Sequence, residues 1–540
     1  MCISAVLRYH EYLRNATLMP IFCLEPKLPP KGGNMNPCTR NSLCRYVGLA
    51  GLWVVCVLAS VHAAHYWVSP DGDDGADGSL GAPLKTIRKA GEVALNPGDI
   101  VTVKPGVYQE RVRVHGEGTP EAPIVFESEE PHGAVLNGSG IREIGFVPAD
   151  WAGVDDNGAK SGNHWVTIRG FAFEELTWNE GDSIEHKVVL NTSTGWVVEA
   201  CTFNRVYLAL NIRGHKCVVR DCLFEDLYSH ALVACYAHGI LIKDVTIRNG
   251  NLNRERVSNS AVNKFLKTDS CIVDNVLSEG HVGPGWWFDA LNTNFTIRNC
   301  TIRNCRGNSY DWEGPGMWLE INPESKSTVY NNEVTGCAGA GICFMESQDI
   351  ECFNNYVAGN GFCVEFRNMP DRTGFLANID VHDNVFADWR NAAVTTSIGE
   401  WNTSVWTPQE YNITVDNNFY CPPDGEPFYS WVGQELNSLG DVTQTLGFDA
   451  NSVVDCNADI KVDVTPQAAV EHTRPRSAPT TLHILFRGTG GLASARPSII
   501  YDLRGRMAGT TSGLRDAPVT ADGTRCARGA YPIRNLSITE

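Results

Sequence analysis

The hydrophobic and polar positions of this chain follow a short pattern that returns ten times: an apolar residue, any residue, usually Asn or Asp, two further residues and another apolar residue. Successive copies start 21 to 34 residues apart. A unit of this length cannot bury its own apolar face, so a stack of such units is the stable arrangement. The copies start at Ile168, Val198, Val219, Ile242, Ile272, Ile297, Val329, Cys352, Val381 and Val415.

Each copy predicts short strands separated by bends. Alternating β-branched residues favour strands, and Asn, Asp or Gly at a fixed offset favours a bend whose side chain bonds the backbone. A leucine-rich solenoid would need Leu-x-x-Leu-x-Leu and a propeller would need longer, more even units, and neither pattern is present. The sequence therefore predicts an all-β fold, a right-handed parallel β-helix of about ten coils over residues 151–463. The third pattern positions are Gly170, Ala200, Asp221, Asp244, Asp274, Asn299, Asn331, Asn354, Asp383 and Asn417.

The segment 65–150 has a different composition and is predicted to hold an N-terminal cap and the first coils. One amphipathic helix is expected at about residues 83–95. Because the first rung of a β-helix has an open edge, a short helix that turns its apolar face inward would cover it. The inward residues are predicted to be Leu84, Ile87, Ala90 and Val93.

Both ends of the chain are predicted to lie outside the solenoid. Residues 1–64 are expected to be a leader and signal peptide, because the apolar run 46–64 follows Arg40 and Arg45 and ends in small residues. Met35 suits the start of such a peptide better than Met1, so the signal peptide is predicted to be 35–64 and the protein to be secreted or exposed at the cell surface. A membrane anchor is the alternative, although the run is short for a bilayer span, and no stable span is expected after signal removal.

After residue 463 the composition changes again. Residues 464–481 are rich in Pro and Thr and are predicted to be a linker. In residues 482–540, YDLRGR followed by GAYPIRN resembles the C-terminal sorting tails of some bacterial secretion systems, which form a small β-domain. Pro532 lies inside the expected closing strand, which departs from that pattern, so an end without function is the alternative.

Longer runs resemble a known superfamily. YWVSPDG, PLKTIRKA and GDIVTVKPGVY are similar to the N-terminal cap of secreted right-handed β-helix proteins in the pectate-lyase-like superfamily. GPGWWFD and EPFYSWVGQELNSLGDVTQTLGFDANSVV resemble middle and closing segments of its uncharacterised bacterial branch. The resemblance implies the fold. It does not imply one reaction, because members include lyases, hydrolases, epimerases and phage-type binding proteins.

Charge and cysteine content narrow the expected partners. With 62 acidic and 44 basic side chains the net charge is −18, which argues against nucleic-acid binding because phosphate contacts need a surplus of Lys and Arg. A polysaccharide or oligosaccharide is the expected partner, and a monomer is expected. Fourteen of the 19 cysteines follow the leader, which predicts some disulfides. The alternative is a buried stack, since Cys201, Cys222 and Cys300 share one repeat position.

Candidate chemistry lies on strands near the middle of the chain, where alternation decides which side chains leave the coil. In GWWFDALN an inward Phe288 puts Trp287 and Asp289 outside, and in GMWLEIN an inward Leu319 puts Trp318 and Glu320 outside. The same alternation puts Glu365 and Lys264 outside. Lys264 and Asp289 each lie eight residues before the next repeat, so they are expected at the same position of successive coils.

These residues predict a glycoside hydrolase. Coils stack about 4.8 Å apart. Asp289 and Glu320 would then be neighbours, and two like charges at about 5 Å supply the acid and nucleophile of a retaining enzyme. Glu320 and Glu365, two coils apart, fit an inverting pair less well. Trp287 and Trp318 would form an aromatic strip on which sugar rings stack.

Three other interpretations stay open. A polysaccharide lyase or epimerase would use Lys264 as the base and a cation such as Arg367 to neutralise a uronic acid. A non-catalytic glycan-binding protein would need the tryptophans alone. In a surface structural protein, the loop 307–315, which holds the second-choice acids Asp311 and Glu313, would cover the charged column.

No cofactor or metal is predicted, with calcium as the one ion considered. The cluster Asp71, Asp73, Asp74 and Asp77 has acidic spacing, but position twelve of an EF-hand loop starting at Asp71 would be Ala82. A turn is the simpler interpretation. No pair of cysteines has the spacing of a structural zinc site.

Overall fold

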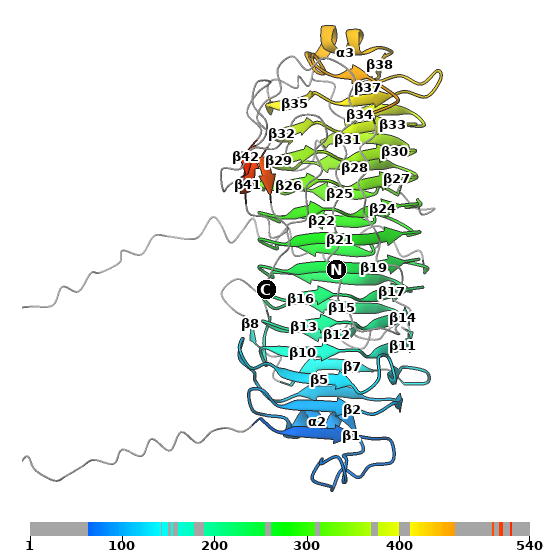
Figure 1. The fold of residues 1–540 in the computed structure, drawn as a ribbon. Coiled ribbons are helices and arrows are strands. Elements are labelled where there is room, and N and C mark those ends of the chain that lie inside the picture. Colours follow the sequence, from blue (N-terminus) through cyan, green and yellow to red (C-terminus); the bar gives the residue numbers. More distant parts are fainter. Residues whose placement is uncertain are drawn as a thin grey trace, which may run out of the picture. The chain divides into compact units, whose positions relative to one another are not determined.

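The computed structural model describes residues 63–141, 143–149, 153–154, 160–177, 188–253, 261–307, 314–368, 376–398, 411–458, 499–501, 507–510 and 519–520. The predicted leader up to residue 62, the linker and most of the tail lie outside these residues. Within them the chain is a right-handed parallel β-helix whose strands stack along one axis (Figure 1). The predicted fold class is confirmed.

A small sheet of 13 strands forms one side of each coil, and all its pairings are parallel except the last. Its twelve parallel strands exceed the ten predicted repeats because the earliest coils lack the Asn or Asp pattern. In stacking order they are β4 (Arg111–Val114), β7 (Gly145–Pro148), β12 (Val188–Thr192), β15 (Leu208–Ile212), β18 (His230–Cys235), β20 (Asn263–Leu266), β22 (Trp286–Asp289), β25 (Met317–Glu320), β28 (Ala340–Met345), β31 (Phe362–Asn368), β34 (Ala392–Ile398), β37 (Tyr429–Trp431) and the antiparallel β38 (Gln434–Leu436).

A large sheet of 24 strands forms the remaining sides, in two columns. The anchor column contains the repeated pattern: β1 (His65–Val68), β2 (Ile100–Val103), β5 (Ile124–Ser128), β10 (Val166–Arg169), β13 (Val197–Glu199), β16 (Val218–Arg220), β19 (Leu241–Arg248), β21 (Ile272–Glu279), β23 (Thr296–Arg298), β26 (Ser327–Tyr330), β29 (Gln348–Phe353), β32 (Ala377–His382) and β35 (Ile413–Asp416).

The second column is joined to the first where β19 and β21 run through both. It comprises β3 (Gly106–Tyr108), β6 (Ala134–Asn137), β11 (Ala172–Leu176), β14 (Thr202–Val206), β17 (Leu223–Glu225), β24 (Thr301–Arg303), β27 (Glu333–Thr335), β30 (Tyr356–Ala358), β33 (Val385–Ala387), β36 (Phe419–Cys421) and β39 (Val453–Val454). Two further sheets are separate: β8 (Gly153–Val154) with β9 (Lys160–Ser161), and β40 (Ile499–Tyr501), β41 (Met507–Thr510) and β42 (Val519–Thr520). The last three lie in the predicted tail, whose sorting role stays a prediction.

The bend after each anchor strand uses the left-handed backbone region. Nine of the predicted bend positions have φ between 52° and 74°. The tenth prediction is wrong by one residue: Ile242 pairs with Val273 rather than Ile272, and Asn275, not Asp274, adopts φ 54°. Asn and Asp tolerate this conformation better than other residues with a Cβ, which explains the pattern in the sequence.

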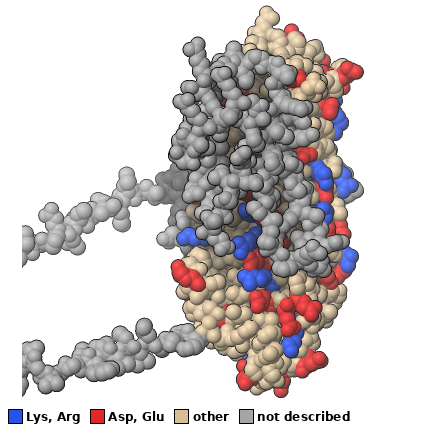
Figure 2. Space-filling model, viewed as in Figure 1, with Lys and Arg blue, Asp and Glu red and all other residues tan. Residues whose placement is uncertain are grey.

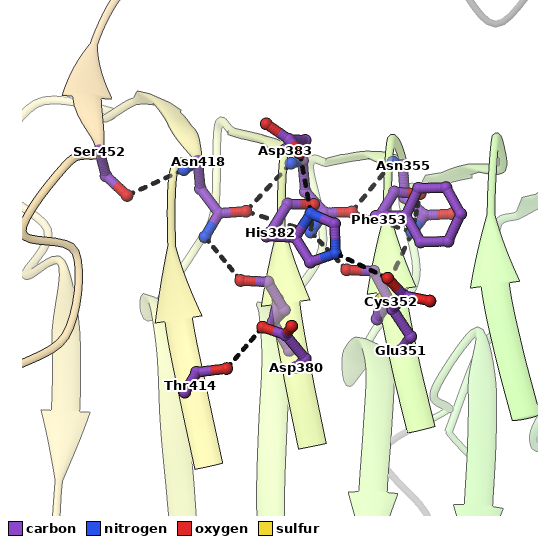
Figure 3. Close-up of polar contacts among 12 residues, drawn as sticks. Glu351, Cys352, Phe353, Asn355, Asp380, His382, Asp383, Thr414, Asn418 and Ser452 are labelled. Atoms are coloured by element: carbon purple, nitrogen blue, oxygen red, sulfur yellow. Dashed lines mark hydrogen bonds and ion pairs between the residues drawn. The ribbon is translucent and has the colours of Figure 1, made fainter. Parts of the chain in front are cut away.

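A ladder of buried amides follows the bends in the last coils. The Asn332 Nδ2 donates to Asn355 Oδ1 at 2.9 Å, Asn355 donates to Asn384 at 2.9 Å, and Asn384 donates to Asn418 at 3.1 Å. Ser452 accepts the backbone N–H of Asn418 at 2.8 Å and ends the ladder (Figure 3). Each Nδ2 also donates to a backbone carbonyl, so the amide groups join the bend of one rung to the next.

Opposite charges alternate on the outer face of the anchor column. Glu127, Arg169, Glu199 and Arg220 share one register position on successive rungs. Arg169 contacts Glu127 at 3.2 Å and Glu199 at 2.5 Å, and Arg220 also pairs with Glu199. On the face drawn in Figure 2, basic and acidic side chains are likewise interspersed rather than separated by sign. The arginines are about half-exposed whereas Glu199 is buried, and the alternation of charges keeps the outer surface polar.

Helices cover both ends. The N-terminal helix α2 (Ile87–Val93) is shorter than the predicted 83–95, because Thr86 accepts the Lys89 N–H and caps it. Its inner face buries Ile87 and Ala90, and Leu84 is buried just before it. At the other end, Ser438 caps the N-terminus of α3 (Leu439–Leu446) and Gly447 (φ 71°) caps its C-terminus. No helix in the described part of the chain is long and apolar enough to cross a membrane.

Most cysteines in the described residues are packed thiols. Eleven are free and buried, whereas Cys421 and Cys456 form a disulfide. Burial raises the pKa of Cys217 to about 11 and that of Cys271 to about 12. The described residues therefore contain both a disulfide and a stack of buried thiols, as the two interpretations of the sequence proposed, and the buried thiols are the majority.

A buried carboxyl closes the C-terminal end. Asp449 accepts hydrogen bonds from the Tyr420 hydroxyl at 3.0 Å, from the Tyr429 hydroxyl at 2.6 Å and from Ser452 Oγ at 2.6 Å. Burial, which these hydrogen bonds only partly offset, raises the pKa of Asp449 to about 6.

Replacing Asn355 with Leu should lower the free energy of unfolding by about 2–4 kcal/mol, because the buried partners on both sides lose their hydrogen bonds. Urea denaturation of the full chain measures this. Asn96→Ala, at an exposed position, is the control and should change stability by less than about 0.5 kcal/mol. Equal effects of the two variants would mean that the ladder adds no stability.

The Asp449 carboxyl should make stability depend on pH. Because folding raises its pKa, this group stabilises the fold fully below about pH 4 and loses that contribution as pH rises through about 6. The wild type should therefore lose on the order of 2–3 kcal/mol relative to Asp449→Asn between these pH values. Unfolding curves at a series of pH values test this, and parallel profiles for the two proteins would contradict it.

Candidate functional site

Three neighbouring strands of the small sheet carry the central candidate residues on their outer face. Trp287 on β22 pairs with Trp318 on β25, and Asp289 pairs with Glu320 in the same register. Between them Phe288 and Leu319 turn inward and are fully buried. The predicted neighbouring position of Asp289 and Glu320 agrees with this pairing.

Lys264 lies one rung before them, on β20, but two positions from the place expected. The sequence spacing equated Lys264 with Asp289, whereas Lys264 is in register with Trp287. The prediction was wrong because it counted from Ile272 instead of Val273 and assumed a constant turn length. The long side chain still reaches the carboxylate, with Nζ 2.9 Å from Asp289 Oδ2 and 3.6 Å from the centre of the Trp287 ring.

Glu320 is held by the two tryptophans. Its Oε2 accepts the indole N–H of Trp287 at 2.9 Å and that of Trp318 at 3.1 Å. The Glu320 residue is only 5% exposed. Two donors on one buried oxygen fix the carboxylate and both rings relative to one another.

Glu365 and Arg367 lie two rungs farther along, on β31. Glu365 falls in the Trp318 position through Cys343, and Arg367 falls in the Glu320 position through Met345. The residue two coils above Glu320 is therefore a cation. Arg367 Nη2 lies 2.7 Å from Glu365 Oε1, and its Cζ lies 5.0 Å from the centre of the Trp318 ring.

The two tryptophans lie outside the coil but are not open to solvent. Each is 4% exposed, and they pack with Ala261, Cys343 and Met345. A cation rests over each ring, Lys264 on Trp287 and Arg367 on Trp318. The sequence indicated the direction of these rings but not these contacts, and the sugar-stacking role stays a prediction.

Further cations lie beside Lys264 and Asp289. Burial raises the pKa of the Cys235 thiol, and the charges of Arg213, Lys264 and Lys267 act in the opposite direction. Arg213 follows β15 in the register position of Cys235, and Lys267 follows β20, with its Nζ 3.1 Å from the Tyr236 hydroxyl. The sequence offered no signal for Arg213, because its register depends on two intervening turns.

Other candidates take structural places or lie outside the described residues. Residues 308–313, with Asp311 and Glu313, are outside them, so the covering-loop hypothesis stays a prediction. The N-terminal aspartates form turns: Asp73 accepts the Gly75 N–H and Asp74 accepts the N–H groups of Lys85 and Thr86. Across the described ranges, no three His, Cys, Asp or Glu side chains are arranged as a metal site. The need for a cofactor stays a prediction.

His281 is a packed histidine beside β21. It is fully buried, its Nε2 lies 2.8 Å from Ser278 Oγ and its Nδ1 accepts the Gly250 N–H at 3.0 Å. Burial lowers its pKa to about 3, so the ring is neutral.

Comparisons with known proteins agree with this fold. Residues 186–362 match the family described as "Right handed beta helix region". Pectate lyase PEL9 of Emericella nidulans is 28% identical over 180 residues, which cover 31% of this chain and 43% of that protein. The uncharacterized protein YwoF of Bacillus subtilis is 28% identical over 111 residues, covering 19% of this chain and 24% of that protein. The chain thus matches less than half the length of either relative.

Among solved structures, the complex of XylC with xylose superposes with a TM-score of 0.52 at 14% identity, covering 74% of this chain and 87% of that one. At this identity the likeness shows the fold alone. The matched segment, residues 186–362, contains β20, β22 and β25, the strands that carry Lys264, Asp289 and Glu320. The resemblance expected from the sequence is confirmed: the chain is a right-handed parallel β-helix protein similar to those of the pectate-lyase-like superfamily.

Proposed function

We propose that this chain is a secreted carbohydrate-active enzyme that cleaves a uronic-acid polysaccharide by β-elimination. The observation that carries the proposal is the pair of Lys264 and Asp289 on the outer face of the small sheet, with Arg213 and Lys267 beside it. The match to a pectate lyase over 180 residues supports the same reaction class.

In this reaction the Lys264 amine is the base, and Asp289 Oδ2, 2.9 Å from Nζ, holds it in position. The amine removes the proton at C5 of the uronic acid, the C4–O bond breaks, and its electrons leave with the oxygen, which takes a proton from solvent. The electrons of the C–H bond form the C4–C5 double bond. Arg213 and Lys267 neutralise the substrate carboxylate, which makes the C5 proton easier to remove.

A retaining glycoside hydrolase is the second candidate. It is favoured by the direct pairing of Asp289 with Glu320, which places two carboxylates on adjacent rungs. However, Asp289 contacts an ammonium and Glu320 accepts two indole N–H groups. These contacts suit Glu320 to positioning Trp287 under Lys264 better than to protonating a leaving group.

Lys264→Ala should lower the rate of polysaccharide cleavage by about 100- to 10,000-fold, because the base is lost. The measurement follows ultraviolet absorbance of the unsaturated product and reducing ends together, on polygalacturonate, alginate and neutral polysaccharides. The matched control is Lys104→Ala, which removes an ammonium 6.0 Å from the Trp67 ring at the N-terminal end and should keep full activity.

Asp289→Asn and Glu320→Gln separate the two candidates. In the lyase, Asp289→Asn should be nearly inactive, whereas Glu320→Gln should keep part of the activity because the amide oxygen still accepts the indole N–H groups. Reducing ends without the ultraviolet signal, lost in both variants, would overturn the lyase in favour of the hydrolase.

A further inference from the structure

A cleft lies on a face other than the small sheet, over β26, β29 and β32 of the anchor column. Its volume is about 320 Å³, at the lower end of the range of small-ligand sites. Its lining carries both charge signs, an amide and hydroxyls, with one buried apolar residue, Ile350, beneath: Lys326, Ser327, Thr328, Asp349, Ile350, Glu351, Asn378 and Asp380. Lys264, Asp289 and Glu320 are on the small sheet, so this cleft is separate from them.

One oxygen of each carboxylate in the cleft is hydrogen-bonded to a neighbouring side chain. Asp349 Oδ1 accepts the Asn378 amide at 2.7 Å, and Asp380 Oδ1 accepts the Thr414 hydroxyl at 2.5 Å. Glu351 Oε1 lies 3.2 Å from His382 Nε2 (Figure 3). The second oxygen of each carboxylate is left to accept a hydrogen bond from a ligand, with its direction already fixed by the first.

His382 keeps this wall rigid and charged. Its ring stacks on Phe353 at 5.4 Å between centroids, and Phe353 stacks on Tyr330 at 5.0 Å. Burial opposes the charged ring, but hydrogen bonds to Asp383 and Glu351 outweigh burial and raise the pKa of His382 to about 10. An imidazolium whose two nitrogens both donate is not a proton acceptor, so the cleft is suited to binding rather than catalysis.

The lining groups favour neutral sugar hydroxyls. Carboxylate oxygens accept from hydroxyl groups, and Lys326, which has no ion pair among the described side chains, donates to them. Asp349, Glu351 and Asp380, with Asp383 beside them, outnumber Lys326 and the charged His382 ring, so the cleft repels a uronic acid. Thr328, Glu351 and Asp380 repeat in register on successive rungs, so acceptors recur about every 4.8 Å along the face.

We propose that this cleft is a second, non-catalytic carbohydrate-binding site that holds neutral sugar units of a polysaccharide. It rests on the proposed function only in taking a polysaccharide as the ligand. The site would keep the enzyme on a mixed polymer while the small sheet acts on its uronic acid units.

The test is affinity electrophoresis of the full chain in gels that contain galactan, arabinan, xylan or a soluble β-glucan, with polygalacturonate and chitosan as charged comparators. At least one neutral polymer should retard the protein. The double variant Glu351→Gln and Asp380→Asn should weaken that retardation about tenfold, since two charged acceptors are lost. Asp416→Asn, on the next rung outside the cleft, is the matched control and should bind as the wild type does.

Lys264→Ala separates this proposal from the first, because it should lose cleavage and keep the retardation. No retardation by any neutral polymer, or equal retardation of the double variant, would overturn the second site. Retardation by polygalacturonate that the double variant loses would overturn the neutral-sugar assignment, and the same result with chitosan alone would show attraction of a polycation instead.

Discussion

Residue-by-residue stacking of parallel rungs is the constraint on which the rest of the structure depends. Each anchor strand pairs with the next in an unbroken register from β10 to β35, and a left-handed bend ends each one or, in β19 and β21, lies within it. Because the register does not slip, every side chain has a defined neighbour one rung away. The polar ladders, the stacked rings and the charged columns are all consequences of this single repeat.

The same repeat explains how charged groups are accommodated on the small sheet. Lys264, Asp289 and Glu320 lie on three successive rungs, so each can reach a partner one spacing away. Burying a charge is costly unless it is paired and hydrogen-bonded. The indole N–H groups and the cation contacts with the rings supply those partners here, and they leave Lys264 and Asp289 as the more exposed pair, at 15% and 20% of their side chains.

The sequence predicted the fold well because its information is local. A bend that needs φ near 55° selects Asn or Asp, as at Asp221, Asn331 and Asp383. The recurrence of these residues can be recognised in the sequence alone. The first coils, predicted within residues 65–150, lack this choice, so their individual strands could not be placed. The site was harder to predict, because turns of unequal length set the register there. Nine residues lead from Lys264 to Val273 but ten lead from Trp287 to Ile297, so counting back from the anchors does not give the register. The covering of Trp318 depends on contacts with Cys343 and Met345 that no pattern records.

The disulfide at the closing end has a consequence for how the molecule comes apart. A solenoid has no long-range contacts across its length, so it opens by fraying from its terminal rungs. The covalent link joins Cys421, at the end of β36, to Cys456, two residues beyond β39, so the last two rungs of the second column cannot separate one by one. Reduction would turn the C-terminal end into the starting point of unfolding, and the intact link would guard that end against proteases.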